Sequence, residues 1–210
     1  MSGPPIWPSR DPAGEDAGSN LYDYAGGNPV DGIDPLGLWA STKGHPVHQM
    51  INQHAFPQLP GSDVALLNNM TVWVDQNQFQ DAAHSYMHAM RDPNDSLGEA
   101  VTKTNAWVSY NMLMARLSEA DGDDELAMMY FGAALHTIQD SSSPAHRCFQ
   151  KWQDNPGLIR EWEHVKQEYL FSQAAKTSVI SDTRKLYDMF IGNTQMPNQF
   201  FDPKTGNPNF

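Results

Sequence analysis

The residues with the clearest capacity for chemistry are histidines and acidic side chains that stand four positions apart. His136 and Asp140 have this spacing in ALHTIQDSSSPAH, and His164 and Glu168 have it in EWEHVKQEY. On an α-helix, side chains four apart lie on one face, about one turn from each other. Imidazole and carboxylate groups together form the ligand set that suits zinc.

A third histidine and an apolar stripe strengthen the first of these pairs. Pro144 ends the helix, and His146 follows closely enough to reach back toward the same place. Met129 and Ala133 precede the pair on the same helical face, so the acid continues an apolar surface where an unpaired charge is costly. One such pair alone is more often a surface ion pair, whereas two pairs and a third histidine favour a metal site.

The elements that must position these residues are helical. Apolar residues recur at helical spacing in five segments, and no segment has the convincing alternation of a strand. The predicted helices cover residues 63–76, 97–118, 124–140, 157–171 and 177–191. Caps are expected at Ser62–Asp63 and Asp95–Ser96, and Gly122 is an expected break. The sequence therefore predicts an all-α, multi-helix bundle preceded by a turn-rich, non-helical segment.

Composition narrows the class of protein. The 210 residues are 40% hydrophobic and 10% aromatic, which indicates a folded chain of one or two domains. The formal net charge of −12 disfavours a nucleic-acid binder. Neither a membrane-spanning run nor a signal peptide is predicted.

Cys148 is the single cysteine, so internal disulfides are ruled out. We expect Cys148 to be a small buried residue, with a role as a thiolate ligand as the alternative.

The first 38 residues are rich in turn signals, which taken alone suit a flexible linker. The string DPAGEDAGSNLYDYAGGNPVDGIDPLGL, from Asp11 to Leu38, resembles the end of the core of Rhs/YD-repeat proteins. In that family a β-shell ends in this motif, cuts itself after the final leucine and encloses a variable toxin. The resemblance implies a boundary between 1–38 and a toxin domain at 39–210. It assigns the cut to Asp11 and Asp34, with Arg10 beside the first, although an aspartate before proline also suits a turn.

The histidine spacing also resembles a family. H-x3-D-x5-H followed by H-x3-E is similar to the ligand series of zinc-dependent phospholipases C, the bacterial group that includes clostridial α-toxin. The resemblance implies up to three zinc ions: one on Asp75, His88, His136 and Asp140; one on His146, His164 and Glu168; and one on Trp39 and His48, with Asp140 shared. His45 competes with His48, and Asp81 or the pair His84/His88 could replace Asp75. We interpret His54 and His84 as surface or core histidines without a role as metal ligands.

The family's N-terminal tryptophan connects the two resemblances. It binds zinc through its α-amine and carbonyl. An amide nitrogen within a peptide is not a metal ligand, whereas a free α-amine with a pKa of about 8 readily becomes one. A cut between Leu38 and Trp39 would therefore create a ligand as well as release a toxin.

The resemblance implies a phospholipase C that cleaves the phosphodiester of membrane phospholipids. Clustered zinc ions lower the pKa of a bound water to about 7 and neutralise a phosphodiester oxygen. Asp75, as general base, and Asp140 are the expected catalytic residues. The expected setting is a delivered effector that acts at the target-cell membrane, carried in an Rhs shell and paired with an immunity protein. One alternative is a related zinc nuclease, in which the last pair of metal ligands usually reads H-x3-D, whereas Glu168 takes the place of that aspartate here. The other is a non-catalytic, metal-stabilised interaction module.

Cleavage after Leu38 is expected to raise the zinc stoichiometry, because the amine of Trp39 becomes a ligand. Intact-mass measurement would detect a fragment that begins WASTK, and metal analysis before and after the cut would give the stoichiometry. A stoichiometry that does not change on cleavage would contradict this activation.

Overall fold

The computed structural model describes residues 46–75, 79–143, 146, 148–152 and 173–210. The chain divides into two compact units, Met1–Val47 and His48–Phe210, and nearly all described residues belong to the second. The predicted boundary between residues 38 and 39 and the predicted helix over 157–171 lie outside the described residues.

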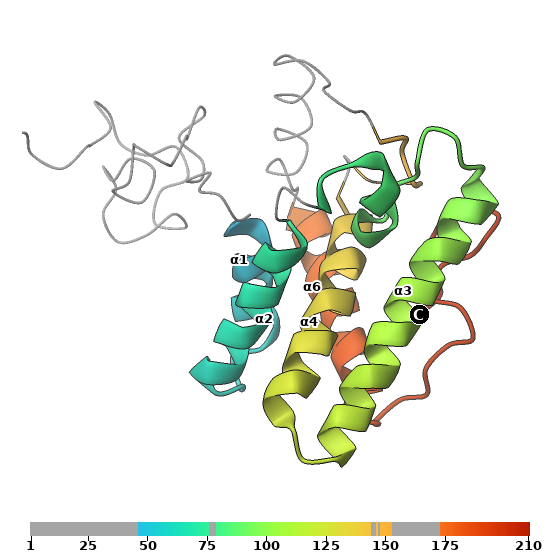
Figure 1. Ribbon diagram of the computed structural model, residues 1–210. Helices are drawn as coiled ribbons and strands as arrows, with labels where there is room; N and C mark the ends of the chain where they lie inside the picture. Colours follow the sequence, from blue (N-terminus) through green and yellow to red (C-terminus); the bar gives the residue numbers. More distant parts are fainter. Residues whose placement is uncertain (1–45, 76–78, 144–145, 147, 153–172) are drawn as a thin grey trace, which may run out of the picture. The chain divides into compact units, whose positions relative to one another are not determined.

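Within the described ranges the chain forms helices and no strands (Figure 1). The elements are α1 (Pro46–Ala55), α2 (Gly61–Val74), the 3-10 helix η4 (Ala82–His88), α3 (Leu97–Ala120), α4 (Asp124–Ser141) and α6 (Gln173–Phe190). The all-α prediction is confirmed, and four of the predicted helices correspond to α2, α3, α4 and α6. Helices α1 and η4 were not predicted, because both are too short for a helical period to stand out.

One of the two predicted helix caps is confirmed, and the other is wrong. Ser96 and Glu99 form a capping box at the start of α3, in which the Glu99 carboxylate accepts from the Ser96 backbone N–H at 2.8 Å. The predicted cap at Ser62–Asp63 is wrong. Helix α2 begins at Gly61 after Pro60, and no side chain caps it. Here the fixed φ of proline starts the helix.

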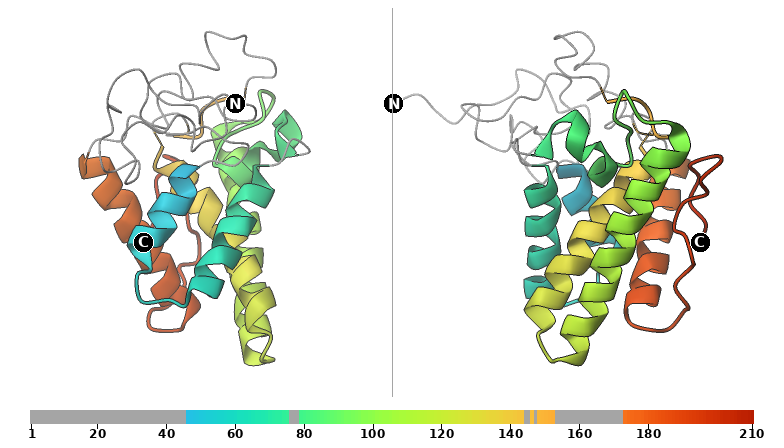
Figure 2. Two further views of the ribbon diagram at one scale, coloured as in Figure 1. Left: turned by 90° about the vertical axis from the view of Figure 1, so that its left-hand side faces the viewer. Right: turned by 45° about the vertical axis from the view of Figure 1, so that its right-hand side comes forward.

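Helix α4 is the central element of this unit. It packs against α2, α3, α6 and η4, and the views of Figures 1 and 2 agree on this arrangement. Every residue from Phe131 to Asp140 is buried. A helix that is buried all round needs apolar side chains or partners for its polar ones. Its last turns carry His136, Thr137, Gln139 and Asp140, so a polar site forms at the carboxyl end of the central helix.

Side-chain bonds tie the neighbouring segments to this end of the bundle. Arg184 of α6 donates to the backbone oxygens of Ala55 at 3.0 Å and His54 at 2.9 Å, which satisfies carbonyls at the end of α1. Thr137 of α4 donates to the Met87 oxygen at 2.6 Å, which fixes the end of η4. Both side chains thus hold segments that carry histidines.

Among the described helices, none is long and apolar enough to cross a membrane.

Gly132 marks a close contact between α4 and α2. A Cβ at this position would lie 2.8 Å from the Met70 Cβ and 3.5 Å from the Leu67 Cα, so the two helices would have to separate. We expect Gly132→Val to lower the free energy of unfolding by about 1–3 kcal/mol in urea denaturation. The matched control is Gly61→Val, where a Cβ meets nothing within 4 Å. Equal stability of the two variants would contradict this packing.

Candidate metal centre

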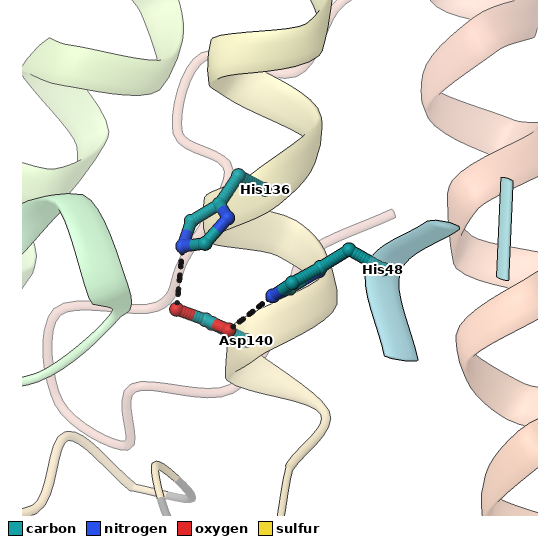
Figure 3. Close-up of side chains that lie close together, drawn as sticks. All are labelled: His48, His136 and Asp140. Carbon is teal, nitrogen blue, oxygen red and sulfur yellow. Dashed lines mark ion pairs between the residues drawn. The ribbon is translucent and has the colours of Figure 1, made fainter. Parts of the chain in front are cut away.

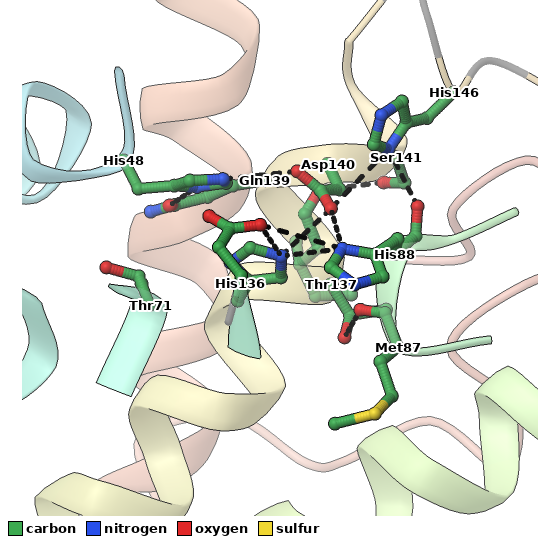
Figure 4. A network of polar contacts seen from close by, with 12 residues as sticks. His48, Thr71, Met87, His88, His136, Thr137, Gln139, Asp140, Ser141 and His146 are labelled. Atoms are coloured by element: carbon green, nitrogen blue, oxygen red, sulfur yellow. Dashed lines mark hydrogen bonds and ion pairs between the residues drawn. The ribbon is translucent and has the colours of Figure 1, made fainter. Parts of the chain in front are cut away.

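Four segments bring histidines and acids together at the end of α4. His48 comes from α1, Asp75 from the C-cap of α2, His88 from the last position of η4, and His136 and Asp140 from α4. Figure 4 shows how the labelled members point toward one another. Two groups of three have ligand atoms within 4.8 Å of one another: His48, His136 and Asp140, and Asp75, His88 and His136. These buried groups can hold a metal ion.

Three ligand atoms form a tight triangle in this cluster. Asp140 Oδ2 lies 3.1 Å from His88 Nδ1 and 3.0 Å from His136 Nε2, and the two nitrogens lie 3.1 Å apart. If both nitrogens carry protons, two N–H groups face each other. If either nitrogen lacks a proton, its lone pair faces the carboxylate oxygen. Every distribution of imidazole protons around an ionised Asp140 leaves one repulsive pair, whereas a cation at the centre attracts all three atoms.

Asp75 extends the triangle to four donors. Its Oδ1 lies 3.8 Å from His88 Nδ1 and 3.6 Å from His136 Nε2. Donors about 2.1 Å from a tetrahedral zinc ion lie about 3.4 Å from one another. Five of the six donor–donor distances of this group run from 3.0 to 3.8 Å, and the donor set is two imidazoles and two carboxyl groups. The residues present therefore fit a zinc ion.

Asp140 also faces a second group through its other oxygen. His48 Nε2 lies 3.2 Å from Asp140 Oδ1, whereas His136 meets Oδ2 (Figure 3). The rings of His48 and His136 lie side by side, with centroids 4.3 Å apart. One carboxyl group thus contacts histidines on two sides, which is the arrangement that a bridging ligand requires.

Burial and neighbouring charges act in opposite directions on the pKa values of His136 and Asp140. Burial lowers the pKa of His136, against the opposite influence of Asp140 and Asp75, so this ring is neutral and can offer a lone pair. Burial acts to raise the pKa of Asp140, but His136 and His146 together lower it well below the ordinary value. An ionised carboxylate in a buried place is compensated by a protonated neighbour or by a bound cation.

His146 contacts the cluster in a different way. Its Nδ1 lies 2.7 Å from the backbone oxygen of His88 and 3.4 Å from Asp140 Oδ2. Because a carbonyl only accepts, Nδ1 carries a proton, and in the neutral ring Nε2 carries the lone pair. His146 therefore donates toward Asp140, and its ligand nitrogen is the other one. The assignment of His146 to a separate ion with His164 and Glu168 stays a prediction, because those two residues lie outside the described ones.

The segments that carry His88 and His146 are joined by backbone bonds. Arg91 N donates to the Gln150 oxygen at 3.0 Å, and Trp152 N donates to the Arg91 oxygen at 2.8 Å. The Trp152 ring lies against the His88 ring, with centroids 5.6 Å apart. Sequence reasoning did not find this pairing, because a single isolated bridge leaves no alternating pattern.

The outward ring nitrogens have different surroundings. His48 Nδ1 lies 2.8 Å from Gln139 Oε1, and His88 Nε2 lies 3.2 Å from Gln80 Nε2. His136 Nδ1 is buried without a hydrogen-bond partner among the described residues. The sequence analysis missed both glutamines. The available signal for Gln139 was its place between His136 and Asp140 on a buried turn, since a buried amide needs partners.

The histidines interpreted as ordinary lie apart from the cluster. His54 is exposed and bonds to the Met50 oxygen of its own helix at 2.9 Å. His84 pairs with Asp81 at 2.8 Å on the surface, so neither Asp81 nor His84 takes the place of Asp75. The predicted burial of Cys148 is wrong. Cys148 is exposed, because the turn buries its neighbour Phe149 against Phe201 instead.

The remaining predicted site residues lie outside the described ranges. They are Arg10, Asp11, Asp34, Leu38, Trp39, His45, His164 and Glu168. Comparison of the chain with models of protein families, with curated proteins and with solved structures finds no match. The case for a function therefore depends on the geometry of the cluster, and the two family resemblances stay predictions.

Zinc is expected to stabilise the folded chain through this cluster. At a free zinc concentration of 100 times Kd, binding contributes about 2.7 kcal/mol. For a chain of this size that corresponds to a rise in Tm of about 5–10 °C over the chelated protein. Asp140→Asn should lose most of this rise, because Asp140 contacts both groups. Differential scanning calorimetry with and without a chelator measures it.

Asp81→Asn is the matched control, because Asp81 pairs with a histidine outside the cluster. This variant should keep the full zinc-dependent rise in Tm. A rise that is the same in Asp140→Asn and in the wild type would place zinc elsewhere on the chain.

Proposed function

We propose that residues 39–210 form a zinc-dependent phosphodiester hydrolase of the phospholipase C type, which acts on membrane phospholipid. The observation that carries the proposal is the triangle of His88, His136 and Asp140. Its mutual distances of 3.0–3.1 Å suit a shared cation better than any arrangement of imidazole protons around an ionised Asp140. Asp75 and His48, which the family resemblance assigns to two of the ions, lie beside this triangle, and this proximity supports the proposal.

The chain's own residues would hold and orient the reaction centre. Zinc, when bound, supplies a Lewis acid that lowers the pKa of water and neutralises charge on a phosphodiester. Asp75, His88, His136 and Asp140 would hold one ion, and His48 and Asp140 would contribute to another. Asp140 keeps the two groups at a fixed separation, because its carboxylate contacts histidines through both oxygens. This fixed arrangement suits the preorganised electrostatics that phosphoryl chemistry needs.

Asp75 is the proposed general base. Its carboxyl group borders the donors of His88 and His136 and is attached to the end of a helix, so it is held against the centre. A carboxylate in such a place can take the proton of the attacking water. Gln80, at 3.5 Å from Asp75 Oδ1, helps to orient it.

Phospholipid is the proposed substrate rather than nucleic acid. From Trp39 onward the chain holds 12 Lys and Arg against 19 Asp and Glu. The resulting net charge of −7 opposes binding of a polyanion, whose affinity depends on basic side chains. Trp152, partly exposed beside the His88 ring, offers an apolar contact for the glycerol and acyl part of a lipid. We further propose that the enzyme is the C-terminal toxin of an Rhs protein, released at Leu38–Trp39 and neutralised by an immunity protein. The support for this setting is the motif of residues 11–38.

Turnover of labelled phosphatidylcholine and phosphatidylethanolamine tests the function. The zinc-loaded protein should release diacylglycerol and the phosphorylated head group, and His136→Ala should lower kcat/KM at least about 100-fold. His84→Gln is the control, because His84 lies outside the cluster, and it should retain activity. Cleavage of single-stranded DNA without lipid turnover would identify a nuclease. A zinc-loaded protein inert on both substrates would leave only a metal-stabilised module.

A further inference from the structure

The side-chain amide of Gln139 contacts the ring of His48 and can therefore determine which ring nitrogen carries the proton. Its Oε1 lies 2.8 Å from His48 Nδ1, on the side of the ring opposite to Asp140 (Figure 4). His48 Nε2 lies 3.2 Å from Asp140 Oδ1. An amide oxygen only accepts, so this contact requires a proton on Nδ1, and the neutral ring then carries its lone pair on Nε2. That lone pair is what a metal ligand needs.

The amide of Gln139 is itself held in this orientation. Its Nε2 donates to Asn52 Oδ1 at 2.8 Å and to Thr183 Oγ1 at 3.3 Å. Asn52 in turn donates through Nδ2 to Asn68 Oδ1 at 3.0 Å. Gln139, Asn52 and Thr183 are 0–1% exposed, so water does not replace these partners. The result is a directional chain of amides that runs from α2 through α1 to the ring of His48.

The opposite direction of this chain has a different chemical consequence. If every amide were reversed, Gln139 would donate to Nδ1, and His48 would carry its proton on Nε2 and donate it to Asp140. Such a histidine satisfies a carboxylate but does not bind metal through that nitrogen. The observed direction leaves the Nε2 lone pair facing Asp140 Oδ1, a contact that becomes favourable when a cation lies there.

We propose that Gln139 is the positioning residue for His48: it fixes the proton on Nδ1, so that Nε2 binds a divalent metal together with Asp140. This inference rests on the metal centre of the proposed function, but not on the identity of the substrate. Gln139 acts through His48 and touches no reacting atom, so it is not a catalytic residue. Neither the histidine spacing nor the family resemblance assigns it a role.

The most direct test is the tautomer of His48 in the full-length wild-type chain. Long-range proton–nitrogen NMR of 15N-labelled protein distinguishes a protonated ring nitrogen from one that carries a lone pair or a metal. The ring signals of His48 are assigned as those that are missing from His48→Gln. With zinc added, these signals should report a proton on Nδ1 and zinc on Nε2. A proton on Nε2 of His48 in the zinc-loaded protein would overturn the proposal without any variant of Gln139.

Removal of the acceptor gives the second test. Gln139→Met keeps the length of the side chain but has no amide, and we expect the affinity of the His48–Asp140 site for zinc to fall about 10–100-fold. Titration calorimetry should show this site weakened, while the site on Asp75, His88 and His136 keeps its affinity. Gln139→Glu restores an acceptor for Nδ1 and should recover most of the zinc affinity.

Asn111→Leu controls for the general cost of removing a buried amide. Asn111 is 2% exposed and donates to the Trp107 oxygen within α3, and it should leave both zinc affinities unchanged. Equal zinc affinities in Gln139→Met and the wild type would overturn the role of Gln139 and leave the proposed function standing. Zinc binding that depends on Gln139, in a protein inert on phospholipid, would overturn the function and leave this role standing. A wild-type chain that binds no zinc would overturn both.

Discussion

The carboxyl group of Asp140 is the contact on which the site depends. Buried at 5% exposure, it lies within 3.4 Å of ring nitrogens of His48, His88, His136 and His146. Such a convergence is unfavourable in an apolar interior unless charge and hydrogen bonds are balanced. Each surrounding segment positions one of these nitrogens, and a divalent cation bound among them would balance the charge of the buried carboxylate.

The fold places this centre through one buried helix. Helix α4 is enclosed by α2, α3, α6 and η4, so a polar turn at its end is surrounded by the ends of its neighbours. Arg184 anchors α1 and Thr137 anchors the end of η4, which keeps His48 and His88 in place. Rigid elements hold ligands more accurately than loops do. The cluster is therefore a product of the same packing that stabilises the bundle.

Sequence reasoning predicted the helices that carry a long apolar period, and it grouped His136 with Asp140 from their spacing alone. It could not derive the approach of Asp75, His48 and His88 from local pattern, since these depend on tertiary packing; the family resemblance supplied them. It missed α1 and η4 because helices of ten and seven residues are shorter than the window over which a helical period is read. It also missed Gln139, whose role exists only through partners on two other elements, α1 and α6. It misjudged Cys148, which a turn exposes.

The central claim is that a divalent cation belongs between these side chains. Anomalous diffraction at the zinc absorption edge, from crystals of the full chain grown with zinc, tests it most directly. The account predicts a strong peak within about 2.3 Å of His88 Nδ1, His136 Nε2 and the carboxyl groups of Asp75 and Asp140. Zinc peaks confined to surface histidines such as His54 and His84, with the cluster joined only by hydrogen bonds, would contradict it.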